Sequence, residues 1–388
     1  MTADLALRGG SLRAPAFGAT VLRCALYLGP LSVAVAAAGP LARVSRPVTA
    51  GTLLLGWSVA HALSGVGAVV ARRCGRGPAA TVVARGFAAA AAFWVVLVLV
   101  APAGLVGADR GLAVTVGLCG LLSLGTVTVA LVTRTEATVL RWSLPCWLLA
   151  AVGIAGLVGD TLAETVPVTV LIPFAVALAA ARAFRPVLGS SPVGRLRPDD
   201  LRYGGIRLLL GAAQAACVAL LWHVGPPAAA SLAVIPVLAA GPVLEALIGW
   251  HHRQVQAGLD VSESDGEFRA HLSDVTVVTV AALLPPLAVG TALAAAALRL
   301  PGGTRAAVLV FAGGILLSGV LAITLLLGWR GRTGVATLLA MAPPAGALVV
   351  SRVLPAEPLS AVVALLAATH LAGLLIVART AADPRRTP

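Results

Sequence analysis

The chain has 388 residues, of which 59% are hydrophobic and only 11% are charged, and its mean hydropathy is +0.98. Soluble domains carry about a quarter charged residues, so this composition excludes a soluble globular protein and indicates an integral membrane protein in a lipid bilayer. The net charge of +13 comes from 28 basic residues, all of them arginine. They lie in short loops between apolar segments and form no clustered basic surface, so no nucleic-acid partner is expected.

Apolar segments long enough to cross a membrane recur along the whole chain. A helix spans the hydrocarbon core of about 30 Å with roughly 20 apolar residues, and clusters of Arg, Asp, Gly and Pro mark where such segments end. The fold class expected is therefore all-α, a polytopic bundle of about 12 transmembrane helices. The predicted spans are approximately 17–39, 48–71, 86–106, 111–133, 142–158, 163–181, 208–224, 228–250, 275–298, 305–328, 334–353 and 359–378.

Six predicted spans lie on each side of the longest basic interruption. This pattern predicts an N-terminal six-helix half at 1–181, a basic cytoplasmic linker at 182–207 and a C-terminal six-helix half at 208–388. The two halves have similar spacing once an insertion after the eighth span is allowed for, as in duplicated transporters whose halves share one orientation.

Orientation follows from the arginines of alternate loops. They number 22 on one side and 6 on the other. Because basic loops stay in the cytoplasm, both termini are expected there, in a multi-pass protein of the cytoplasmic (inner) membrane.

The insertion between the eighth and ninth spans, residues 251–274, is polar. Its five acidic residues and three histidines suggest metal ligands, but they lack compact ligand spacing and do not form a calcium-binding loop. The sequence favours a solvated loop, with short interfacial helices around 255 and 268. The five cysteines are widely spaced and form no C-x-x-C pair, so no disulfide framework, metal site or cofactor is expected.

Few ionisable or polar side chains fall within the predicted spans. Each charged one costs about 2.5–3.5 kcal/mol to insert, so each needs a reason to be there. The transport or cavity candidates are Glu245, Arg23, His61, Arg85 and Gln214.

Glu245 is the first of these candidates. It lies five residues, about 7 Å at helical rise, inside the predicted boundary at Trp250. It is placed to pair with an arginine at the same depth, such as Arg23, or to bind a proton; the alternative is an interfacial carboxylate that reaches water. For His61, near the middle of its span, a hydrogen bond between helices is favoured over a proton relay, and Gln214 suits the same bonding role.

The sequence contains no recognisable catalytic pattern. Asp199 and Asp200 follow Pro198 at the lead into the seventh span, where they suit the first turn of a helix better than magnesium binding. No G-x-S-x-G, H-E-x-x-H or P-loop motif occurs. Neither enzyme activity nor a catalytic residue is expected.

Three stretches carry a resemblance to a transporter superfamily. RLRPDDLRYGGIRLLLGAAQAACVALLWHVGPPAAASLAVIPVLAAGPV, residues 195–243, is similar to the start of the second half of polysaccharide flippases in the multidrug/oligosaccharidyl-lipid/polysaccharide (MOP) export superfamily. GWSVAHALSGVGAVVARRCGRGPAATVVARG, residues 56–86, is similar to the corresponding part of the first half. LEALIGWHHRQVQAGL, residues 244–259, resembles the acidic and aromatic segment of exopolysaccharide exporters. Together these stretches cover about a quarter of the chain.

The resemblance implies two six-helix lobes that open a central cavity alternately to the two sides of the membrane. The cargo would be a lipid-linked saccharide or another amphiphile, and glycan-synthesis proteins would be partners. Such cavities usually carry several cationic groups for the pyrophosphate. Here Arg23 and Arg85 lie near the predicted cytoplasmic ends, which departs from that pattern.

Two alternatives stay open. VARRCGRGP, residues 70–78, resembles the loop between helices two and three of major facilitators, although Arg72 stands where their acidic residue belongs. That reading predicts a small-molecule exporter. The other alternative is a non-transport membrane scaffold of a glycan-synthesis complex.

Overall fold

A computed structural model describes residues 3–157, 165–189, 196–226, 230–353 and 357–380 of the chain. All regular secondary structure in these residues is helical, which confirms the predicted all-α membrane bundle. The contacts divide the chain into two compact units, unit 1 (Met1–Ala212) and unit 2 (Ala213–Pro388).

The predicted spans correspond to helices in the described part of the chain. Eight helices are long and apolar enough to cross a membrane: α3 (Arg46–Cys74), α4 (Arg76–Val100), α6 (Arg110–Thr133), α11 (Pro198–Val224), α13 (Asp265–Ala297), α14 (Gly302–Trp329), α15 (Thr333–Val353) and α16 (Pro358–Arg379). A ninth span results if α7 (Glu136–Trp142) and α8 (Leu144–Leu157), which meet at 45°, are counted together. The remaining predicted spans fall on α1 (Ala3–Ala36), α10 (Val168–Ala183) and α12 (Ala230–Val261).

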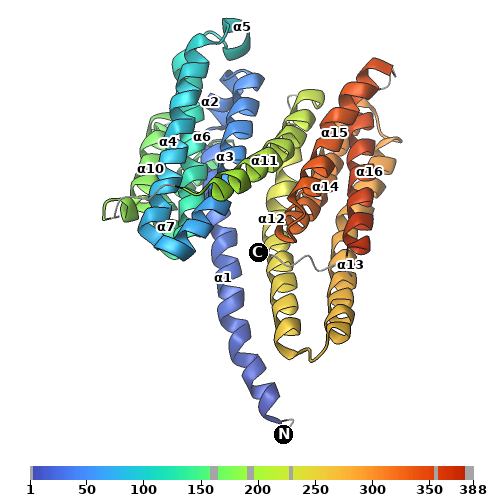
Figure 1. The fold of residues 1–388 in the computed structure, drawn as a ribbon. Helices are drawn as coiled ribbons and strands as arrows, with labels where there is room; N and C mark the ends of the chain where they lie inside the picture. Colours follow the sequence, from blue (N-terminus) through green and yellow to red (C-terminus); the bar gives the residue numbers. More distant parts are fainter. Residues whose placement is uncertain (1–2, 158–164, 190–195, 227–229, 354–356, 381–388) are drawn as a thin grey trace. The chain divides into compact units, whose positions relative to one another are not determined.

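Unit 1 contains two packed groups of helices. α3, α4 and α6 lie side by side, and α1, α8 and α10 pack together next to α6 (Figure 1). The buried indole of Trp94 on α4 fits against Gly117 on α6, where any side chain would overlap it, and its Nε1 donates to the Ala113 carbonyl at 3.3 Å. Small residues thus allow the close helix approach that packing in a membrane favours.

Unit 2 is built around α14. This helix packs against α12, α13, α15 and α16. Of its 18-residue apolar stretch, 72% is buried inside the protein. Gly319 of α14 makes room for the ring of His370 on α16, which is fully buried. The His370 Nε2 pairs at 3.0 Å with the carbonyl of Leu283, next to Pro285 and Pro286, which lack backbone donors.

The insertion at 251–274 is helical around 255 and 268, as predicted, but these segments are the ends of two long helices and not short helices within a loop. α12 continues to Val261 and α13 begins at Asp265, giving a hairpin of two long helices (yellow and orange in Figure 1). Ser264 caps α13 by accepting from the Glu267 amide at 3.3 Å, while the Glu267 carboxylate accepts from the Glu263 amide at 3.0 Å. This reciprocal cap starts the second helix directly after the first and leaves only a short turn between them.

Several helices begin earlier than the predicted spans, and two of these early starts affect charged residues. α11 begins at Pro198, within the predicted linker, and α4 begins at Arg76, so Arg85 lies inside a helix. Proline at the first helical position, followed by Asp199 and Asp200 in the first turn, explains the early start of α11.

Candidate functional site

The first half of α11 packs antiparallel along α3 within unit 1, and we call this contact the α3–α11 seam. At one end, Arg73 Nη1 and Asp200 Oδ2 form an ion pair at 2.9 Å. Further along, a Cβ at Gly65 would lie 2.6 Å from Arg207 Cδ. At the far end, a Cβ at Gly211 would lie 2.9 Å from the Cα of Ser58. The glycines therefore let the two backbones approach closely.

His61 and Arg207 bring polar atoms into the α3–α11 seam. Arg207 Nη1 donates to the Tyr203 hydroxyl at 2.7 Å, and its guanidinium lies 5.4 Å from the centre of the Tyr203 ring. The His61 ring lies 5.4 Å from that of Trp57. His61 Nδ1 and Arg207 Nε are buried and lack a hydrogen-bond partner among the described residues. The hydrogen bond to another helix that the sequence predicts for His61 is thus not formed by this nitrogen.

Arg207 lies in the basic stretch that the sequence assigns to the linker, and for that reason it was not among the predicted site residues. The sequence shows an amphipathic segment directly before the seventh predicted span. It does not show that this segment packs closely against α3, because hydropathy gives the depth of a residue in the membrane and not the helix next to it.

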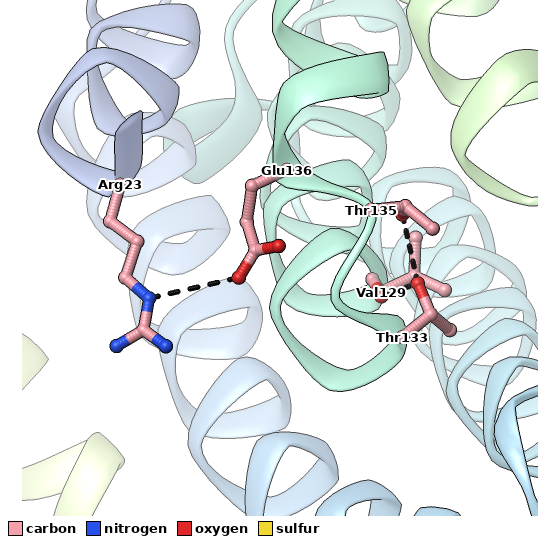
Figure 2. Close-up of polar contacts among 5 residues, drawn as sticks. All are labelled: Arg23, Val129, Thr133, Thr135 and Glu136. Atoms are coloured by element: carbon pink, nitrogen blue, oxygen red, sulfur yellow. Dashed lines mark hydrogen bonds and ion pairs between the residues drawn. The ribbon is translucent and has the colours of Figure 1, made fainter. Parts of the chain in front are cut away.

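Arg23, which the sequence suggests as a partner for Glu245, forms an ion pair with Glu136 within unit 1. Arg23 Nε on α1 lies 3.7 Å from Glu136 Oε1 at the start of α7, and the two side chains point toward each other (Figure 2). The Glu136 side chain is 11% exposed, against 45% for Arg23. Next to this pair, the hydroxyls of Thr133 and Thr135 are 2.9 Å apart.

The remaining predicted candidates are dispersed. Gln214 is buried and its Nε2 donates to Thr324 Oγ1 on α14 at 2.8 Å, which is the bond between helices expected from the sequence. Arg85 is exposed on α4. Glu245 lies on α12, and its side chain is outside the described part of the structure. Transport roles for these residues stay predictions.

Arg330, which follows the last residue of α14, forms a polar hub in unit 2 that sequence reasoning missed. Its guanidinium donates to Thr276 Oγ1 at 2.8 Å, to the Val377 carbonyl at 3.4 Å and to His251 Nε2 at 3.2 Å. The Nδ1 of buried His251 in turn pairs with Thr279 Oγ1 at 2.8 Å. Burial, and then the charge of Arg332, lower the pKa of Arg330 to about 10, so the hub keeps its charge at neutral pH. It connects α14 with α12, α13 and α16.

No protein-family model and no curated protein matches the sequence. Among solved structures, the chain is similar to a eukaryotic MATE transporter, AtDTX14, with 12% identity and a TM-score of 0.51, over 95% of this chain and 96% of that one. It is also similar to an inward-facing multidrug resistance MATE family transporter of the MOP superfamily, with 11% identity and a TM-score of 0.48, over 95% of each chain. Such low identities speak for the fold alone. The chain therefore has a multi-pass helical fold similar to that of this eukaryotic MATE transporter.

Proposed function

We propose that this chain is a membrane transporter that moves a lipid-linked saccharide, or a related amphiphile, across the cytoplasmic membrane by alternating access. Both termini lie on the cytoplasmic side in this proposal, as the arginine distribution indicates. The activity is transport and not catalysis.

The observation that carries the proposal is the fold. The chain contains two compact helical units, and its fold is similar to that of a MATE transporter, an architecture on which alternating access is built. This likeness favours a MOP-type transporter over the major-facilitator alternative. It leaves the cargo open, so the cargo has to be argued from the residues.

The structure of α11 also supports movement. Its first half packs on α3 in unit 1, while its second half is tied into unit 2 by Gln214 and by Cys217, whose thiol donates to the Ala340 carbonyl at 3.0 Å. A single helix shared by two compact units couples any motion of one unit to the other.

The lipid-linked cargo is supported by the chemistry of the α3–α11 seam. It holds a guanidinium and an imidazole on helices that are long and apolar enough to cross a membrane, next to aromatic rings. Positive charge of this kind suits an amphiphile with an anionic head group, and ionisable residues inside a membrane commonly mark a substrate pathway.

The test is mass spectrometry of lipid extracts and surface glycan from a strain that lacks the protein. Accumulated lipid-linked saccharide with depleted surface polymer, restored by the native chain, is the expected result. Complementation with Glu245→Gln asks whether that carboxylate takes part, and failure of this variant would place it in the mechanism. Unchanged lipids and glycan in the deletion strain would reject the cargo and redirect the proposal to small-molecule export.

A scaffold for glycan synthesis would give a different pattern. Loss of a scaffold lowers the amount of lipid-linked saccharide, because synthesis stops, whereas loss of a flippase raises it. The direction of change in the lipid-linked pool therefore separates the two functions.

A further inference from the structure

The α3–α11 seam contains two buried side-chain nitrogens with unmet hydrogen-bonding capacity. His61 Nδ1 and Arg207 Nε are both buried without a hydrogen-bond partner in the described part of the chain. Buried polar nitrogens in proteins are nearly always bonded to protein or water. Two such atoms on neighbouring helices therefore point to a partner that the described residues do not supply.

The register of the two helices places these nitrogens on facing surfaces. Gly65, about one turn after His61 on α3, faces Arg207. Gly211, about one turn after Arg207 on α11, faces His61. A Cβ added at Gly211 would lie 3.0 Å from the Cβ of His61. Both side chains thus extend along the same contact, one turn apart.

The charge of Arg207 is not balanced within the described residues. A guanidinium stays protonated in proteins, and none of the described carboxylates forms an ion pair with this one. Asp200, one of the two acids on the same helix, is held by Arg73 at 2.9 Å. The Tyr203 hydroxyl that accepts from Arg207 is neutral. An unbalanced cation on a helix that is long and apolar enough to cross a membrane points to a site for an anion.

We propose that His61 and Arg207 bind a phosphate group of the cargo, with Trp57 and Tyr203 beside it. An oxyanion accepts hydrogen bonds from both nitrogens, and the planar guanidinium matches phosphate geometry. His61 donates when its proton is on Nδ1. The identity of the cargo rests on the proposed function, whereas the phosphate site is measurable without transport.

Access to this site requires the α3–α11 seam to part. The close approaches at Gly65 and Gly211 bring the two helices together around the two donors. A phosphate enters only when the first half of α11 moves away from α3, and the Arg73–Asp200 ion pair is the contact that such a movement breaks.

The test is native mass spectrometry of the purified full-length chain with polyprenyl diphosphate, compared with neutral polyprenol of the same length. The native chain retains the diphosphate lipid and not the polyprenol. Arg207→Gln weakens retention of the diphosphate lipid by about tenfold or more. Arg207→Lys keeps the charge but loses the planar guanidinium, so its retention lies between that of the native chain and that of Arg207→Gln. His61→Phe weakens retention, and His61→Gln, which restores a donor, recovers part of it.

Arg202→Gln is the matched control, because Arg202 is exposed on the same helix and the variant loses the same charge. It retains the lipid as the native chain does. Equal retention by Arg207→Gln and the native chain, or equal loss in Arg202→Gln, would overturn the site. Thermal unfolding of each variant shows whether it is folded, and Arg207→Lys provides the comparison if Arg207→Gln does not fold.

A competition with inorganic diphosphate identifies which part of the lipid is recognised. Displacement of the lipid supports a site that reads the head group alone. Retention of the lipid, combined with its loss in Arg207→Gln, supports a site that also needs the isoprenoid chain.

The experiments can reject the phosphate site without rejecting the transport function, and the reverse. Arg207-dependent binding by a chain that moves no lipid-linked saccharide would leave the site standing and reject the function. Undiminished transport by Arg207→Gln would reject the site and leave the function standing.

Discussion

Arg73 at the end of α3 and Asp200 at the start of α11 form an ion pair with 2.9 Å between Nη1 and Oδ2. The Asp200 side chain is 6% exposed and also accepts from the Arg197 backbone amide at 3.3 Å, whereas Arg73 is 41% exposed. The pair closes the α3–α11 seam at one end. Because the carboxylate is the buried partner, its removal should cost more than removal of the arginine.

Asp200→Asn is expected to lower the free energy of unfolding by about 1–2 kcal/mol, since it removes a charged acceptor that is already desolvated, while solvent screening at Arg73 moderates the loss. Thermal unfolding of the detergent-solubilised chain measures the effect. Asp199→Asn is the control, because Asp199 is exposed in the same helical turn. Equal destabilisation by the two variants would show that the helix dipole, and not the ion pair, explains the result.

Gly211→Ala tests the closeness of the α3–α11 seam. The new Cβ would meet the Ser58 Cα at 2.9 Å, and a backbone atom cannot move aside cheaply, so destabilisation of about 1–3 kcal/mol is expected. Gly205→Ala on the same helix meets nothing within 4 Å and should be neutral or slightly stabilising, because alanine favours helix. If Gly211→Ala behaved like Gly205→Ala, the described packing of α11 on α3 would be incorrect.

Gln214 and Thr324 form a buried hydrogen bond between α11 and α14. Such bonds in membrane proteins contribute about 0.6 kcal/mol on average and up to about 1.7 kcal/mol. A double-mutant cycle with Gln214→Leu and Thr324→Val should yield a coupling energy in this range. A coupling energy of zero would mean that the two side chains do not interact in the folded protein.

The Arg330 hub should be important for the stability of unit 2. Arg330→Ala removes the donor to Thr276, Val377 and His251 at once, and a loss of about 2–3 kcal/mol is expected. Arg299→Ala, at an exposed arginine, is the charge-matched control in thermal unfolding. Similar unfolding temperatures for the two variants would argue against the hub.

The positions of the spans were predictable because each crossing needs a long apolar segment, and the sequence shows twelve of them. The helical hairpin was also readable, since Ser264 and Glu267 form a capping pattern at the start of its second helix. The partners of charged groups were not predictable. Hydropathy gives the depth of Arg23, but only packing brings Glu136 to it. His61 and Arg207 likewise lie on helices that only packing brings together, at Gly65 and Gly211.

The most direct test of transport is translocation of a lipid-linked saccharide in proteoliposomes that contain only this chain. We predict movement across the bilayer that depends on the protein and stops when Val66→Cys and Gly204→Cys are joined by a disulfide across the α3–α11 seam, where a Cβ at Gly204 would lie 2.8 Å from Val66. Reduction of the disulfide should restore movement. Translocation no faster than in protein-free vesicles would contradict the account.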